Sequence, residues 1–118
     1  MSANPELGVC YYPEHWPEEL WVSDAQNMIK NGIKWVRIAE FAWSKIEPDP
    51  GIFDWNWLDK IVDILGNSGL KIVMCTPTAT PPKWLVDQMP DMVALDKNGP
   101  ARKFGSRRHY SFSHQGYQ

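Results

Sequence analysis

Asn31-Gly-Ile-Lys-Trp-Val36 is echoed by Ser68-Gly-Leu-Lys-Ile-Val73, at a spacing of 37 residues. In both stretches a glycine follows a helix-like pattern and precedes an apolar run of strand length. A helix end, a glycine turn and a strand that recur together are typical of consecutive βα units. Because parallel strands need a crossover connection, the repeat predicts an α/β protein with a parallel sheet.

The patterns around this repeat continue the alternation of strands and helices. We expect buried strands at 7–12, 33–38 and 70–75, and helices at 17–30, 55–67 and 81–89. Pro17 is the expected first residue of the first helix, and Asp54 is the expected N-cap of the second. From Pro90 onward the sequence is loop-like, with glycine and proline as breaks.

An open doubly wound sheet and a (β/α)8 barrel both fit this order of elements. No G-x-G-x-x-G follows the first strand and no G-x-x-x-x-G-K-[ST] occurs, so nucleotide-binding open sheets lose their main support. The barrel is therefore preferred. A complete barrel needs about 250 residues, and 118 residues supply only its first three or so units. We therefore expect 1–118 to be the incomplete N-terminal part of a barrel domain, unstable by itself.

Composition excludes several classes of function. Twelve Lys and Arg against 14 Asp and Glu give a net charge of −2, which argues against a nucleic-acid or anionic-membrane partner. The sequence has no apolar run long enough for a membrane span and no visible signal peptide, so a cytoplasmic location is expected. Cys10 and Cys75 lie in apolar runs without C-x-x-C spacing, so we expect buried thiols and neither a metal nor another cofactor.

Polar and aromatic side chains follow each predicted strand, at the edge where α/β barrels carry their active sites. They are Tyr11, Tyr12, Glu14, His15 and Trp16 after the first strand, Arg37, Glu40, Phe41 and Trp43 after the second, and Thr76, Thr78, Thr80, Arg107, Arg108, His109 and Tyr110 after the third. Charged groups and hydroxyls bind sugar hydroxyls, and indole faces stack on the C–H side of sugar rings. These clusters fit a carbohydrate site.

Each cluster also has a purely structural interpretation. Glu14 and His15 are equally consistent with the start of a solvated loop. Arg37, at the end of a buried strand, needs a partner such as a carboxylate, because an unpaired buried charge is costly. Three tryptophans are expected in a core or an interface rather than in a stacking surface: Trp43, Trp55 and Trp57.

Five segments, in order, resemble the β-galactosidases of glycoside hydrolase family 42. They are Gly8-Val-Cys-Tyr-Tyr-Pro-Glu-His-Trp-Pro17, Arg37-Ile-Ala-Glu-Phe-Ala-Trp-Ser44, the loop Glu47-Pro…Gly51…Phe53-Asp54, Thr76-Pro-Thr-Ala-Thr-Pro-Pro-Lys-Trp-Leu85 and Arg107-Arg-His-Tyr110. The resemblance runs from about Leu7 to Tyr117. It implies a (β/α)8 barrel followed by smaller domains, often assembled as trimers, that hydrolyses terminal β-galactosyl residues with retention of configuration.

The catalytic residues implied by this resemblance are not in the sequence. A retaining mechanism needs a carboxylic general acid and a carboxylate nucleophile. In the family these glutamates end the fourth and seventh strands, so both are expected beyond Gln118, and the chain alone is expected to be inactive. Glu14, Glu40 and Glu47 match neither position.

The resemblance does imply substrate-binding residues. It aligns Arg107 with an arginine that contacts the galactose hydroxyls, and it assigns Arg37 and Glu40 to shaping the galactose pocket and orienting the nucleophile. Many members carry a cysteine directly after the Arg-His-Tyr segment, as the first ligand of a four-cysteine zinc site. Ser111 stands at that position. Serine is a poor zinc ligand, which argues against the zinc and not against the activity.

Two alternatives stay open beside a β-galactosidase. One is a carbohydrate-binding or interaction module that has the rim residues and lacks the chemistry. The other is a barrel glycosidase of a related family with a different sugar preference.

Overall fold

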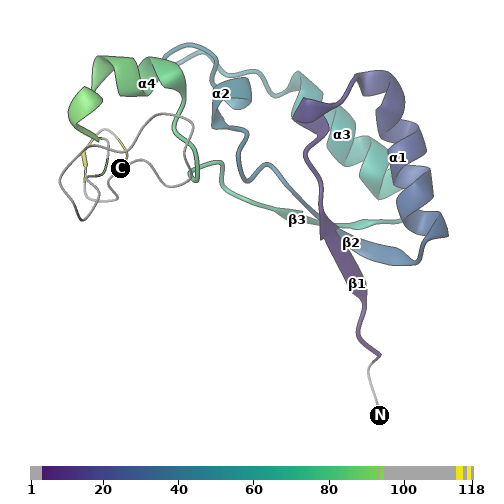
Figure 1. Cartoon of the computed structure of the whole chain (residues 1–118). Coiled ribbons are helices and arrows are strands. Elements are labelled where there is room, and N and C mark those ends of the chain that lie inside the picture. The colour runs from purple at the N-terminus through teal and green to yellow at the C-terminus, as the bar shows by residue number, and fades with distance from the viewer. Residues whose placement is uncertain (1–3, 93, 95–113, 116, 118) are drawn as a thin grey trace. The chain divides into compact units, whose positions relative to one another are not determined.

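The computed structural model describes residues 4–92, 94, 114, 115 and 117. The chain divides into two compact units, Met1–Ala39 with Trp55–Cys75 and Glu40–Asp54 with Thr76–Gln118. The first unit holds β1 (Leu7–Cys10), the 3-10 helix η1 (Pro13–His15), α1 (Glu18–Lys30), β2 (Ile33–Ile38), α3 (Asn56–Asn67) and β3 (Lys71–Met74). The second holds α2 (Trp43–Ile46), α4 (Lys83–Gln88) and the 3-10 helix η2 (Pro90–Met92) (Figure 1).

The first unit is built on a parallel sheet of three strands in the order β1-β2-β3. Arg37 of β2 pairs with Cys10 on one side and with Val73 on the other. The helices α1 and α3 are the crossover connections, and they lie side by side over one face of the sheet (Figure 1). The predicted parallel α/β arrangement is therefore confirmed, with β2 at the predicted residues.

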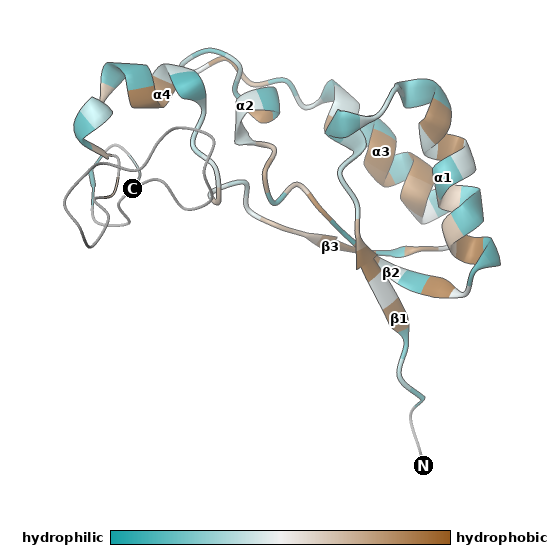
Figure 2. Cartoon of the chain, viewed as in Figure 1, coloured by the Kyte–Doolittle hydropathy of each residue, from teal (hydrophilic) through white to brown (hydrophobic). Residues whose placement is uncertain are grey.

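An apolar layer fills the space between these two helices and the sheet. Its almost fully buried side chains come from α1, α3 and β2: Trp21, Ala25, Val36, Ile38, Ile61 and Leu65. On α3 the buried positions recur at three- and four-residue spacing, which makes one face of the helix apolar (Figure 2). Burying one large apolar side chain of this kind contributes about 1.5–3 kcal/mol, so this layer is the core of the first unit.

The opposite face of the sheet carries no helix of the described first unit. Along β2, Val36 and Ile38 are buried, whereas Trp35 is exposed. Every residue of β1 and β3 is exposed or half-buried. The prediction of three buried strands is therefore wrong for β1 and β3, because helices cover only one side. The expected burial of the thiols is wrong for the same reason, since Cys10 is exposed and Cys75 is half-buried.

The predicted signals lie close to the ends of the helices, but not every predicted position is right. Helix α1 begins at Glu18, so Pro17 is its N-cap and not its first residue as predicted. The chain leaves α1 through Gly32 at a φ of 81°, a backbone angle that glycine adopts easily. The predicted Asp54 cap is wrong, because α3 begins at Asn56 and the Asp54 amide donates to the Ile46 carbonyl at 2.7 Å. None of the described helices is long and apolar enough to cross a bilayer.

Candidate functional site

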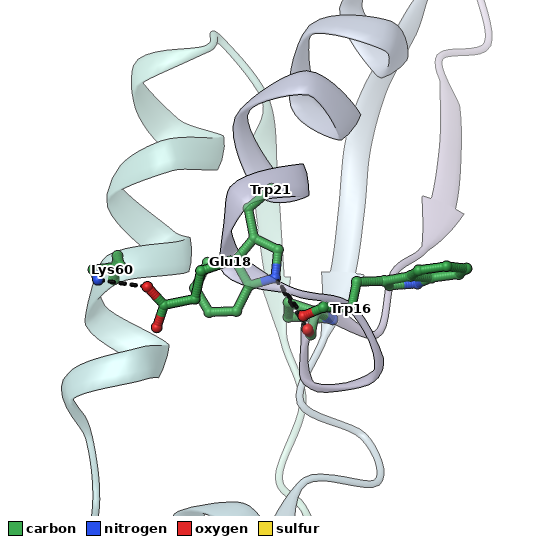
Figure 3. Close-up of polar contacts among 5 residues, drawn as sticks. Trp16, Glu18, Trp21 and Lys60 are labelled. Atoms are coloured by element: carbon green, nitrogen blue, oxygen red, sulfur yellow. Dashed lines mark hydrogen bonds and ion pairs between the residues drawn. The ribbon is translucent and has the colours of Figure 1, made fainter.

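The turn that follows β1 is fixed to the core by Trp21. The Trp21 side chain is 1% exposed, and its Nε1 donates to the carbonyls of Pro13 at 3.0 Å and Trp16 at 3.3 Å (Figure 3). The indole of Trp16 is directed away from Trp21 and is 54% exposed. Helix α1 therefore holds η1 in place at the carboxyl edge of the sheet while one aromatic face is presented to solvent.

Tyr11 ties the same turn to α1 by a second contact. Its hydroxyl donates to Oδ2 of Asp24 at 2.6 Å. Burial raises the pKa of the Tyr11 phenol far above its ordinary value, and the hydrogen bond to Asp24 and the negative charges of Asp24 and Glu14 add to this effect. The phenol therefore stays protonated and remains a donor across the pH range of folded proteins.

The Glu14 carboxylate belongs to the interior of this edge. Both of its oxygens are buried, and neither has a hydrogen-bond partner among the described residues. Burying a polar group is costly unless a hydrogen-bond donor compensates for its lost hydration. The interpretation as a solvated loop is therefore wrong for Glu14. His15 is exposed, and its ring centroid lies 5.5 Å from that of Tyr12.

Arg37 lies on the open face of the sheet and not in a buried position. It is exposed and lines a hollow of about 290 Å³ with Cys10, Trp35, Val73 and other residues of the strands. The expectation of a buried guanidinium is therefore wrong, because β2 buries only the side chains that face the helices.

Ala39 turns the chain at the end of β2. Its φ is 74°, in the left-handed region, which costs about 1–2 kcal/mol for a residue with a Cβ. Ala39 is nevertheless almost fully buried, so packing holds it in this conformation. Glu40 follows directly, half-buried, as the first residue of the second unit. Arg37 and Glu40 therefore belong to different units.

Hydrogen bonds to Glu47 connect three segments of the second unit. Its Oε1 accepts from Trp43 Nε1 at 2.9 Å, and its Oε2 accepts from the Gly51 amide at 3.0 Å. Its backbone carbonyl accepts from Trp84 Nε1 at 2.8 Å. These bonds join α2, the loop after it and α4, so that the connections following β2 and β3 form one body. The sequence showed Glu47 only as an acidic loop residue; its four-residue spacing from Trp43 was the available signal.

A small apolar cluster supports this body. Leu85, Val86 and Met92 form its buried centre, with Trp43, Trp84 and Tyr117 packed against it. The prediction that Trp43 serves a core is thereby confirmed, as it is for Trp57, which is buried in the first unit. Trp55 is 49% exposed, so it is not a core residue, and its place in an interface stays a prediction.

The sequence profile described as β-galactosidase, glycoside hydrolase family 42, matches residues 10–118. The chain belongs to this family. It is 55% identical over 112 residues to the β-galactosidase of Thermus thermophilus, which is 95% of this chain and 17% of that protein.

Two solved structures of β-galactosidases match the fold. The enzyme of the psychrophilic Marinomonas ef1 has a TM-score of 0.89 and 59% identity, over 96% of this chain and 17% of that one. The enzyme of the haloarchaeon Halorubrum lacusprofundi has a TM-score of 0.88 and 50% identity, with the same coverage of 96% and 17%. The predicted family and fold class are confirmed, and the chain spans about 17% of the length of these family 42 relatives.

The structure describes only some of the residues that were predicted for the site of this family 42 chain. Arg107 and Ser111 lie outside the described residues, and the role of Arg107 stays a prediction, as do those of Arg37 and Glu40. Within the described ranges, no group of three or more His, Cys, Asp or Glu side chains could hold a metal ion.

Proposed function

We propose that this family 42 chain is the N-terminal part of a β-galactosidase that hydrolyses terminal non-reducing β-D-galactosyl residues with retention. The observation that carries the proposal is the match to proteins named β-galactosidase, in sequence and in structure, along almost the whole chain. The parallel sheet supports it, because its carboxyl edge, with Arg37 near it, is where α/β barrels bind their ligands.

The proposed mechanism uses two glutamates supplied beyond Gln118. One protonates the leaving oxygen, and the other, about 5–5.5 Å away, attacks the anomeric carbon to form a glycosyl-enzyme. Water then hydrolyses this intermediate, with the first glutamate acting as base. The residues of this chain bind and orient: Arg107 contacts the galactose hydroxyls, and Arg37 and Glu40 shape the pocket and orient the nucleophile.

We propose further that the whole protein is a cytoplasmic homo-oligomer, a trimer as the resemblance implies, whose partner is a β-galactoside. The net charge of −2 supports a neutral sugar substrate over nucleic acid or an anionic membrane.

A panel of aryl glycosides tests the proposed activity on the longest natural polypeptide that contains this chain. We expect fast release of the aryl group from the β-galactoside, and slow release from the β-glucoside, β-mannoside and α-galactoside. A preference for another sugar would support the related glycosidase, and no turnover with any of them would support the binding module.

Arg107→Ala in that protein is expected to lower kcat/KM for an aryl β-galactoside by about 10- to 150-fold. This corresponds to the loss of about 1.5–3 kcal/mol of charge-assisted hydrogen bonding in the transition state. Arg108→Ala is the matched control, because it removes the same side chain from the next position. A loss in Arg108→Ala with unchanged kcat/KM in Arg107→Ala would move the sugar contact to Arg108.

A further inference from the structure

Trp35 is held on the open face of the sheet by two charged side chains. Its Nε1 donates to Oε2 of Glu6 at 3.0 Å, and Nζ of Lys71 lies 5.0 Å from its ring centroid. Lys71 also pairs with Glu6 at 3.3 Å. The three side chains, which we call the Trp35 cluster, fix the indole at the amino ends of the strands.

Gly8 makes room for this arrangement. It lies opposite Trp35 in the register of β1 and β2. A Cβ at Gly8 would stand 3.0 Å from the Trp35 Cβ and 3.3 Å from the Trp35 carbonyl oxygen, which is tight enough that Trp35 would have to shift by a few tenths of an ångström. The absence of a side chain at residue 8 therefore allows Trp35 to lie against β1.

Arg37 lies directly above the Trp35 cluster on the same face. Residues two apart on a strand point to the same side, about 6.6 Å apart along it. Trp35 and Arg37 line the same hollow of about 290 Å³ on the open face. Trp35 therefore lies on the amino-terminal side of Arg37 along β2, beside the same hollow.

We propose that Trp35 is a positioning residue that acts through Arg37. Its indole forms a floor beneath the guanidinium and restricts the long Arg37 side chain to conformations that point towards the carboxyl edge. An arginine held in this way loses less rotamer freedom when it binds a ligand, which is the advantage of a preorganised contact. The role rests on the proposed function, since it needs a sugar that Arg37 contacts.

A double-mutant cycle in the full-length enzyme tests this role. Trp35→Leu is expected to lower kcat/KM for the aryl β-galactoside about tenfold, mainly through KM. In an Arg37→Ala background the same substitution is expected to change kcat/KM less than twofold, because Arg37 is the group through which Trp35 acts. Trp35→Phe, which keeps an aromatic ring at this position, is expected to recover most of the loss.

Trp55→Leu is the matched control, because it removes another part-exposed indole of the same unit at the start of α3, in the helix layer. Any effect it has is expected to be equal in both backgrounds. An equal loss from Trp35→Leu in both backgrounds would overturn the positioning role. If Trp35→Leu does not fold, Trp35→Met takes its place in the cycle.

The cycle also separates this inference from the proposed function. An enzyme that cleaves another aryl glycoside and no galactoside contradicts the proposed substrate, and the cycle is then run on the glycoside that it cleaves. Coupling between Trp35 and Arg37 on that substrate supports the positioning role, and additivity overturns it. An enzyme that neither cleaves nor binds any glycoside overturns both proposals.

Discussion

The 118-residue chain expressed alone is expected to release no aryl group from an aryl β-galactoside that the longer protein hydrolyses. The general acid and the nucleophile are both expected beyond Gln118. Enzymes typically accelerate their reactions by about 10⁶-fold or more, and we expect that acceleration to be lost without these two groups. Both polypeptides are assayed at equal molar concentration with the same substrate. We expect the longer protein to hydrolyse the substrate, and the chain alone to leave the reaction at its uncatalysed rate.

The open face of the sheet also predicts how the chain alone behaves in solution, which can be measured beside its activity. Val73, which lines the hollow on this face, is 43% exposed, and Leu7 and Met74 on the two edge strands are 56% and 49% exposed. Edge strands with such side chains favour association. We therefore expect the chain alone to associate or to unfold without a cooperative transition. A monomeric chain that unfolds cooperatively and binds galactose in calorimetry would contradict this prediction and would support the binding module.

Trp21→Ala is expected to lower the free energy of opening of the first unit by about 3–5 kcal/mol, the range for removing a buried aromatic side chain. The substitution empties the centre of the layer between α1 and the sheet, and it also removes the donor that holds η1 through Pro13 and Trp16. Hydrogen exchange of the α1 and η1 amides in the full-length protein measures the change.

Two further variants separate packing from hydrogen bonding at this position. Trp21→Phe keeps most of the apolar volume and loses Nε1, so its cost is expected to be the smaller one, about 1–3 kcal/mol. Trp55→Ala is the control, because Trp55 is 49% exposed and surface substitutions usually change stability by about 0.5 kcal/mol or less. Equal rates of hydrogen exchange at the α1 and η1 amides in Trp21→Ala and Trp55→Ala would show that Trp21 does not stabilise the carboxyl edge of the sheet.

Much of the first unit was predictable because its signals are local. The apolar run after Gly32 places β2 at Ile33–Ile38, and Pro17 places the start of α1. The prediction that Asp54 caps α3 was wrong, because a contact that is not local decides the position of Asp54. Its amide donates to the Ile46 carbonyl across a loop. Helix α2 has four residues, too few to show a helical period.

The sequence by itself determined the alternation of strands and helices, the parallel sheet and membership of glycoside hydrolase family 42, because these depend on short patterns and on motifs in order. Only the tertiary structure decided which face of each strand is covered, and therefore that Arg37 is exposed and the Glu14 carboxylate is buried. It also brought Glu6 and Lys71, 65 residues apart, to the two sides of Trp35. Contacts at such separations depend on how the layers pack, and no local pattern in the chain encodes them.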